Sequence, residues 1–260
     1  MAFIQIEYYS ESLGQFRQVE VLYPDASEVT KDEATSTAIP VLYLLHGMSG
    51  NQHSWTGRTH LTRLVRYTNL IVVMPNTENG WYTNTKYGVN YYDAIATELP
   101  QVMRRFFPNM TDKREKTFIA GLSMGGYGAF KLAFLTNQYA MAGSFSGTLQ
   151  FDMNLRGDTP QEKAYWKGVF GEDEEFLASD NHLLNAAKKA DGKTKFYAWC
   201  GQGDFLFPAN ETAIADFKTI GIEVDYRTNH GTHDWYYWEK QIELFLEMLP
   251  IDYVKEERLS

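Results

Sequence analysis

The chain has 260 residues, of which 44% are hydrophobic and 22% are charged, and its formal net charge is −9. This length is enough to bury the core of one large domain, and the negative charge opposes binding to nucleic acid or to anionic membranes. No segment approaches the ~20 consecutive apolar residues of a membrane span, and no basic-then-apolar signal segment opens the chain. We therefore expect a cytoplasmic protein that acts on a small molecule.

Two segments near the N-terminus, 4–8 and 19–23, alternate between apolar and polar residues. A period of two predicts half-exposed strands, which are typical of antiparallel pairing. The polar stretch at 25–37 has no periodicity and predicts a surface loop.

Continuous apolar runs bounded by Gly, Pro or Asn predict strands buried on both faces, at 39–45, 70–74, 117–120, 196–200 and 222–226. Helical periodicity fills the intervals, at 61–67, 94–107, 127–135, 209–220 and 235–249. Pro100 should kink the second of these helices.

The single cysteine, Cys200, lies in an apolar run and is expected to be a buried, inert thiol.

This alternation predicts an α/β fold with a mostly parallel central sheet, helices on both faces and antiparallel strands at the N-terminus. One domain over 1–260 is the simplest interpretation. The least regular stretch, 148–194, is either an insertion that partly covers a site as a lid or surface decoration.

The sequence Gly121-Leu122-Ser123-Met124-Gly125-Gly126 directly follows the apolar run at 117–120 and precedes a helical pattern. This is the G-x-S-x-G elbow of the α/β-hydrolase fold, in which a tight strand-to-helix turn exposes the serine hydroxyl. We therefore predict that Ser123 is a nucleophile.

A serine nucleophile needs a base, which in this fold follows the serine and a carboxylate along the chain. Of the late histidines, His182 lies in the irregular stretch, whereas His230 and His233 share the loop before the last helix. His233 directly precedes that helix, which would fix it more firmly, so we favour it over His230.

The orienting carboxylate should follow a strand between Ser123 and His233. Asp204 ends the turn after the 196–200 run, whereas Asp225 falls in a predicted strand and Asp216 on a predicted helix. Asp234 is too close in sequence to His233 to fold back onto it. Asp204 is therefore the predicted partner.

Two backbone amides should stabilise the oxyanion, one from the residue after the nucleophile and one from a loop after an early strand. Met124 is the first, and Met48 is the candidate for the second, with Gly47 allowing a close approach. His46 precedes the serine, the wrong order for a base, and is predicted to be structural.

Around these motifs, the sequences at 46–48, 121–128 and 233–238 resemble the esterase D group, which includes S-formylglutathione hydrolases, feruloyl esterases and mycolyltransferases. The segments 69–82, 114–128 and 231–240 are similar to small bacterial tributyrin esterases. The resemblance implies the triad Ser123, Asp204 and His233, oxyanion donors Met48 and Met124, and a cytoplasmic, often oligomeric enzyme for short acyl esters. Gly50 stands where S-formylglutathione hydrolases often have cysteine, a departure that weighs against glutathione thioesters.

These residues predict a serine carboxylesterase that works through an acyl-enzyme and needs no metal or cofactor. Aromatic residues beside the motif loops could wall an acyl pocket, or simply pack there; they are Trp55, Trp81, Tyr82 and Trp235. A thioesterase or acyltransferase would use the same triad. A non-catalytic binding protein is a remote alternative, since it needs none of these groups.

Overall fold

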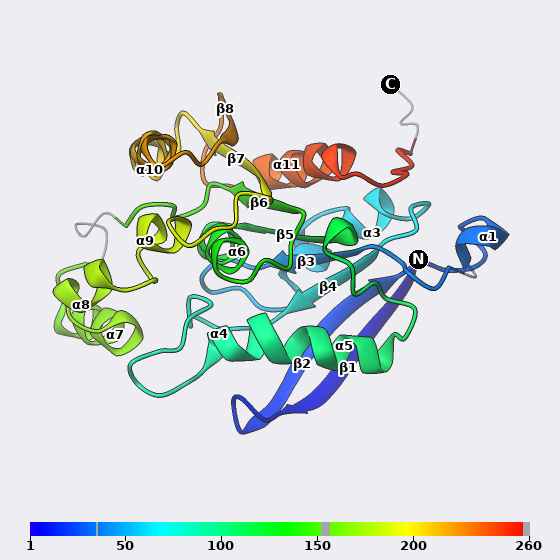
Figure 1. The fold of residues 1–260 in the computed structure, drawn as a ribbon, viewed down its shortest axis with the longest axis horizontal. Coiled ribbons are helices and arrows are strands. Elements are labelled where there is room, and N and C mark those ends of the chain that lie inside the picture. Colours follow the sequence, from blue (N-terminus) through cyan, green and yellow to red (C-terminus); the bar gives the residue numbers. More distant parts are fainter. Residues whose placement is uncertain (35, 152–156, 257–260) are drawn as a thin grey trace.

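The computed structural model describes residues 1–34, 36–151 and 157–256. Its centre is one eight-stranded sheet with the strand order β1-β2-β4-β3-β5-β6-β7-β8 (Figure 1). β1 pairs with β2, and β2 with β4, in antiparallel fashion, and all later pairings are parallel. The strands are β1 (Ala2–Ser10), β2 (Gln15–Tyr23), β3 (Val41–Leu45), β4 (Ile71–Pro75), β5 (Thr117–Leu122), β6 (Met141–Phe145), β7 (Lys195–Gly201) and β8 (Val224–Asn229). The predicted mostly parallel sheet with antiparallel N-terminal strands is confirmed.

The helices fall mainly between the strands. They are α1 (Lys31–Ala34), α2 (Ser54–Arg58), α3 (Leu61–Leu64), α4 (Tyr91–Asp93), the π-helical turn η1 (Ala94–Glu98), α5 (Leu99–Phe106), the 3₁₀ turn η2 (Arg114–Lys116), α6 (Met124–Leu135), α7 (Pro160–Phe170), α8 (Asp173–Ala178), α9 (Leu183–Ala187), α10 (Phe207–Thr219) and α11 (Trp235–Met248). In the part of the chain that the structure describes, none of them is both long enough and apolar enough to cross a membrane.

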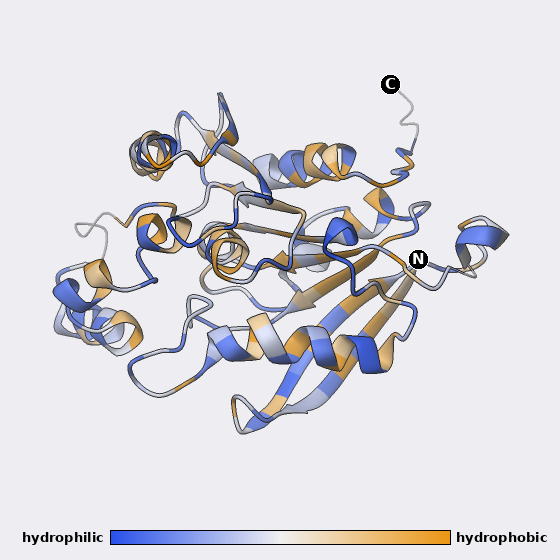
Figure 2. Ribbon diagram, in the orientation of Figure 1, coloured by the Kyte–Doolittle hydropathy of each residue, from blue (hydrophilic) through white to orange (hydrophobic). Residues whose placement is uncertain are grey.

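Both faces of the sheet are covered, because alternate residues of each inner strand point to opposite sides. On β3, Tyr43 and Leu45 join one apolar cluster with α5, α6 and α10, whereas Leu42 and Leu44 join another with α3 and α11. Figure 2 shows the inner strands as almost wholly hydrophobic, while β1 and β2 alternate in colour. The inner strands therefore read as continuous apolar runs in the sequence.

β8 differs from its prediction. The run at 222–226 predicts a strand buried on both faces, but β8 begins at Val224 and its residues alternate between half-buried and exposed. β8 has β7 on one side only, since it is the last strand of the sheet. An edge strand needs only one apolar face.

The helix expected at 94–107 changes geometry ahead of Pro100. Residues 94–98 form the π-helical turn η1, and Pro100 lies in the first turn of α5. Proline has no N–H to offer the carbonyl four residues earlier. That carbonyl, on Ala96, instead accepts a hydrogen bond from Gln138 Nε2 at 2.9 Å. The α-helical hydrogen-bond pattern is thus interrupted by a π-helical turn before Pro100, and the carbonyl that the proline cannot serve has a partner elsewhere.

The segment at 148–194 contains α7, α8 and α9, and residues 152–156 of it lie outside the described part of the chain. α7 and α8 lie together at one end of the molecule, beyond the sheet (Figure 1). α9 packs against α6. Just before α9, Asn181 accepts hydrogen bonds from two side chains of α6, from Tyr127 Oη to its carbonyl at 2.8 Å and from Lys131 Nζ to its Oδ1 at 2.5 Å. Burial lowers the pKa of Lys131 to about 7.

Candidate active site

Ser123 lies in the tight turn between β5 and α6, with φ = 52° and ψ = −118°. This left-handed region is unfavourable for a residue with a side chain, so the surrounding structure must hold it. The Ser123 N–H donates to the Phe145 carbonyl at 3.0 Å. A Cβ added to Gly121 or to Gly125 would lie 2.5 Å from backbone atoms, of Gly125 and Leu45 respectively. Only glycine at those two positions lets the turn close.

The loop between β8 and α11 brings His233 to this serine. His233 Nε2 lies 3.1 Å from Ser123 Oγ, and His233 Nδ1 lies 2.9 Å from Asp204 Oδ2. A carboxylate only accepts, so Nδ1 carries the ring proton and Nε2 is left to accept from the serine hydroxyl. The three side chains form one chain of hydrogen bonds with the order needed to draw a proton from Ser123.

Asp204 is buried in the turn that follows β7, and its side chain is 0% exposed. Burial raises the pKa of a carboxyl group, but hydrogen bonds from His233 and from the Leu206 N–H outweigh this and leave the pKa of Asp204 below its usual value. It is therefore ionised at neutral pH and able to fix the His233 tautomer.

The alternative residues serve elsewhere. His230 is exposed and its ring faces Tyr237, while half-buried His182 begins α9 and contacts Phe176. Asp225 binds Arg227, and Asp234 accepts from the Tyr236 N–H and so caps α11. Within the described residues none of these is hydrogen-bonded to Ser123 or His233.

The loop after β3 lies against Ser123, since a Cβ added to Gly47 would be 3.3 Å from Ser123 Cβ. The Thr77 N–H donates to His46 Nε2 at 3.1 Å, so the ring proton is on Nδ1, which donates to the Gly47 carbonyl at 2.7 Å. The peptide is trans, so the Met48 N–H points to the opposite side from this carbonyl. That N–H has no hydrogen-bond acceptor among the described residues. Burial lowers the pKa of His46 to about 4, so the ring stays neutral.

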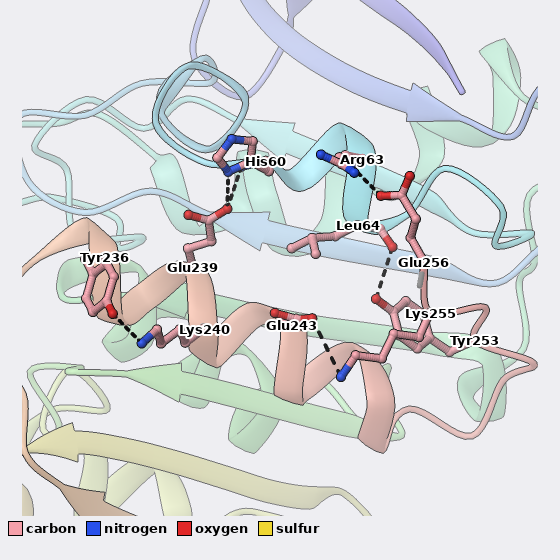
Figure 3. Close-up of a pocket in the computed structure, with 10 residues that line it drawn as sticks. All are labelled: His60, Arg63, Leu64, Tyr236, Glu239, Lys240, Glu243, Tyr253, Lys255 and Glu256. Atoms are coloured by element: carbon pink, nitrogen blue, oxygen red, sulfur yellow. Dashed lines mark hydrogen bonds and ion pairs between the residues drawn. The ribbon is translucent and has the colours of Figure 1, made fainter. Parts of the chain in front are cut away.

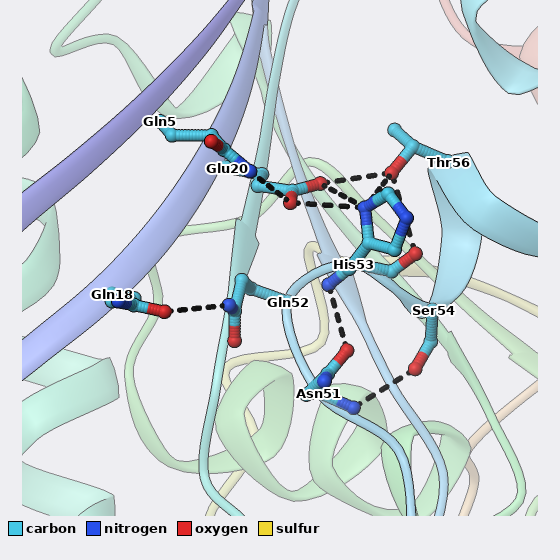
Figure 4. Close-up of polar contacts among 8 residues, drawn as sticks. All are labelled: Gln5, Gln18, Glu20, Asn51, Gln52, His53, Ser54 and Thr56. Carbon is cyan, nitrogen blue, oxygen red and sulfur yellow. Dashed lines mark hydrogen bonds and ion pairs between the residues drawn. The ribbon is translucent and has the colours of Figure 1, made fainter.

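The same loop is fastened to β2 by a second histidine–carboxylate pair (Figure 4). Buried Glu20 accepts from His53 Nδ1 at 3.0 Å and from Thr56 Oγ1 at 2.8 Å. The Thr56 hydroxyl lies beside the same ring nitrogen as the carboxylate, 3.2 Å away. Nucleophilic activation requires the two on opposite nitrogens, as Ser123 and Asp204 are on His233. This cluster therefore anchors the loop and cannot act as a triad.

Two cavities open beside Ser123. The first, the aromatic cavity, has a volume of about 320 Å³ and is lined by Met48, Trp81, Ser123, Thr148, Phe151, Glu162, Tyr165, Trp166, Phe205 and Leu206. The second, the arginine cavity, has a volume of about 420 Å³ and is lined by Gly47, Met48, Ser49, Gly50, Ser54, Arg58, Leu122, Ser123, Phe205, His233, Trp235 and Trp238. Ser123, Met48 and Phe205 border both, so a substrate held at Ser123 can extend in two directions.

The sequence and the fold of this chain match those of known esterases. The Esterase family model, described as “Putative esterase”, matches residues 10–248. The chain belongs to the Esterase family. It is 31% identical to an acetyl esterase of Caldicellulosiruptor saccharolyticus over 93% of this chain and 96% of that protein.

Two solved Staphylococcus aureus structures, each 28% identical to this esterase, cover 95% of it and 98% of their own chains. One is FphF, a fluorophosphonate-binding serine hydrolase in a substrate-bound form, with a TM-score of 0.84. The other is the S-formylglutathione hydrolase FrmB, with a TM-score of 0.80. The esterase is thus a carboxylic ester hydrolase with the α/β-hydrolase fold.

The aromatic residues singled out in the sequence divide into two kinds. Trp81 lines the aromatic cavity and Trp235 the arginine cavity, but Trp55 and Tyr82 line neither. Trp55 Nε1 donates to the Leu45 carbonyl and Tyr82 Oη to the His46 carbonyl, and both side chains are fully buried. Trp55 and Tyr82 therefore pack beneath the loop that follows β3 and do not line either cavity.

Sequence reasoning missed several residues of the esterase's site. Phe205 borders both cavities, and its ring centroid lies 4.7 Å from that of His233. Its position directly after Asp204 was the only available signal. Arg58 ends a five-residue helix, and Tyr165 and Trp166 come from α7, so no motif marks them.

Proposed function

We propose that this esterase hydrolyses short-chain acyl esters, from acetyl to butyryl, through an acyl-enzyme formed on Ser123. The observation that carries the proposal is the hydrogen-bonded chain from Ser123 Oγ through His233 to buried Asp204. The acetyl esterase relative, matched over nearly its whole length, supports the short acyl group.

In the first step, His233 Nε2 takes the Ser123 proton as Oγ bonds to the ester carbonyl carbon. The Met48 and Met124 amides stabilise the negative oxygen of the tetrahedral intermediate. The bond to the alcohol oxygen then breaks, and that oxygen receives the proton from His233. Water repeats the sequence on the acyl-enzyme, which releases the acid and restores the serine hydroxyl.

A second candidate is hydrolysis of a thioester, which the similarity to the S-formylglutathione hydrolase FrmB favours. It would use the same Ser123 and His233, because only the leaving atom changes from oxygen to sulfur. Rates on an acetyl thioester and its matching oxygen ester would rank the two.

The test is hydrolysis of 4-nitrophenyl acetate, butyrate and octanoate by the wild type and by Ser123→Ala. The wild type should prefer the shorter chains, and loss of the nucleophile should lower kcat by about 10⁶. Equal thermal unfolding curves would show that the variant is folded. A serine-directed phosphonate should label the wild type once and the variant not at all. Undiminished hydrolysis by Ser123→Ala would refute the proposal.

A further inference from the structure

The position of His233 decides which cavity holds which half of an ester, provided that the proposed function is right. The leaving oxygen must be near His233 Nε2, because this nitrogen returns the proton to it. His233 lines the arginine cavity and not the aromatic cavity. The leaving alcohol therefore extends into the arginine cavity, and the acyl group into the aromatic one.

Arg58 gives the arginine cavity a positive charge that no acidic side chain offsets. Among the described residues Arg58 forms no ion pair, and no carboxylate lines this cavity. Its guanidinium lies 5.8 Å from the centroid of the Trp235 ring, and the side chain is exposed. The ring can hold the flat group in place without using its N–H donors.

A groove elsewhere on the surface shows the contrast (Figure 3). It lies between α3 and α11, and three of its basic groups have acidic partners: Arg63 with Glu256, His60 with Glu239, and Lys255 with Glu243. The fourth, Lys240, donates a hydrogen bond to the Tyr236 hydroxyl. Charges paired in this way offer little to a ligand. Arg58 differs in that it lines a cavity and forms neither an ion pair nor a side-chain hydrogen bond within the described residues.

The aromatic cavity carries the opposite charge. Glu162 lines it, and hydrogen bonds from the side chain and backbone of Thr159 hold the pKa of this carboxyl below its usual value. An anionic acyl group would be repelled there, whereas an anion on the leaving side would meet Arg58.

We propose that Arg58 selects esters whose leaving alcohol or phenol carries a negatively charged group, with carboxylate as the simplest case. A guanidinium donates two parallel hydrogen bonds to a carboxylate. In a protein with a net charge of −9, this local positive charge also offsets the general repulsion of an anionic substrate.

The test compares two esters with the same acetyl group, 4-acetoxybenzoate and its neutral methyl ester. Selectivity is the ratio of their kcat/KM values, anionic over neutral, so intrinsic reactivity cancels between variants. Arg58→Gln should lower this ratio about five-fold relative to the wild type. Arg63→Gln removes the same charge from the groove of Figure 3 and should leave the ratio unchanged. Salt should lower the ratio in the wild type and not in Arg58→Gln.

An unchanged ratio in Arg58→Gln, or equal losses in both variants, would overturn the proposal. Binding of 4-hydroxybenzoate, followed by NMR titration, needs no chemistry and should weaken in Arg58→Gln alone. A protein that binds this phenol through Arg58 but hydrolyses neither ester would refute the proposed function and keep this inference. Hydrolysis with no role for Arg58 would do the reverse.

Discussion

Two regions meet at Ser123 and are held by different forces. The candidate catalytic centre consists of Ser123, His233, Asp204 and the Gly47–Met48 peptide. Hydrogen bonds of 2.7–3.1 Å hold it together. The wall of the aromatic cavity is held by ring packing. The Trp81 ring lies 4.9 Å from that of Phe151 and 5.2 Å from that of Trp166.

Because one region is held by hydrogen bonds and the other by ring packing, we expect the two to tolerate substitutions differently. Hydrogen bonds between polar groups depend steeply on distance and angle, and the side chains of Ser123, His233 and Asp204 each have a specified partner. Ring packing is less directional, and a smaller side chain leaves space without leaving a buried charge or donor unsatisfied. Substitutions in the centre should therefore lower turnover by orders of magnitude, and those in the wall should shift preference between substrates.

The largest effect in this set is expected for Asp204→Asn, which keeps the shape of the side chain. An amide can donate to His233 Nδ1 and so favour the wrong tautomer, which should lower kcat by about 10⁴. Stopped-flow or steady-state kinetics with 4-nitrophenyl acetate measure the change in kcat. Asp234→Asn is the matched control, because Asp234 adjoins His233 but caps α11, and its kcat should stay within a few-fold of wild type.

A smaller decrease in kcat is expected when His46 no longer orients the Gly47–Met48 peptide. In His46→Gln the side-chain amide lies near the former Nε2 position and can still accept from the Thr77 N–H. It is too far from the backbone to replace Nδ1 as the donor to the Gly47 carbonyl. Misdirecting one oxyanion donor should lower kcat by about 10²-fold, with little change in KM. His46→Asn places its amide near the Nδ1 position and should recover most of this loss. Equal losses in the two variants would show that His46 acts only through packing.

His46 also makes stability depend on pH. Because burial lowers its pKa from 6.5 to about 4, the unfolded chain takes up a proton first as the pH falls. The free energy of unfolding should therefore decrease between pH 6.5 and 4, by up to about 3 kcal/mol. His46→Gln lacks this contribution, so urea unfolding across that range should show a shallower pH dependence than in the wild type.

The centre was the more predictable region from sequence. Its glycines, its short strand before Ser123 and the chain order Ser123, Asp204, His233 are local signals of one turn geometry. The structure brings these three side chains within hydrogen-bond distance. Their catalytic roles remain predictions that the variants above test.

The walls were less predictable, because lining a cavity depends on tertiary position. Trp81 and Tyr82 are adjacent in the sequence, yet one lines the aromatic cavity and the other is fully buried under the loop. Likewise the apolar residues of 222–226 did not reveal that β8 is the edge of the sheet, which follows from the strand order. Local composition indicates neither which aromatic residue lines a cavity nor which strand is at the edge of the sheet.

The smallest effect is expected in the wall, at Trp166. This ring belongs to α7 and borders the aromatic cavity, so Trp166→Ala should lengthen the space available to an acyl chain. A few added methylene contacts correspond to roughly ten-fold in kcat/KM, so the octanoate-to-acetate ratio should rise by about that factor. Trp166→Phe keeps a ring in place and should shift the ratio less. If Trp166→Ala instead lowered both rates equally, α7 would support the centre without shaping the acyl site, and the contrast between the two regions would fail.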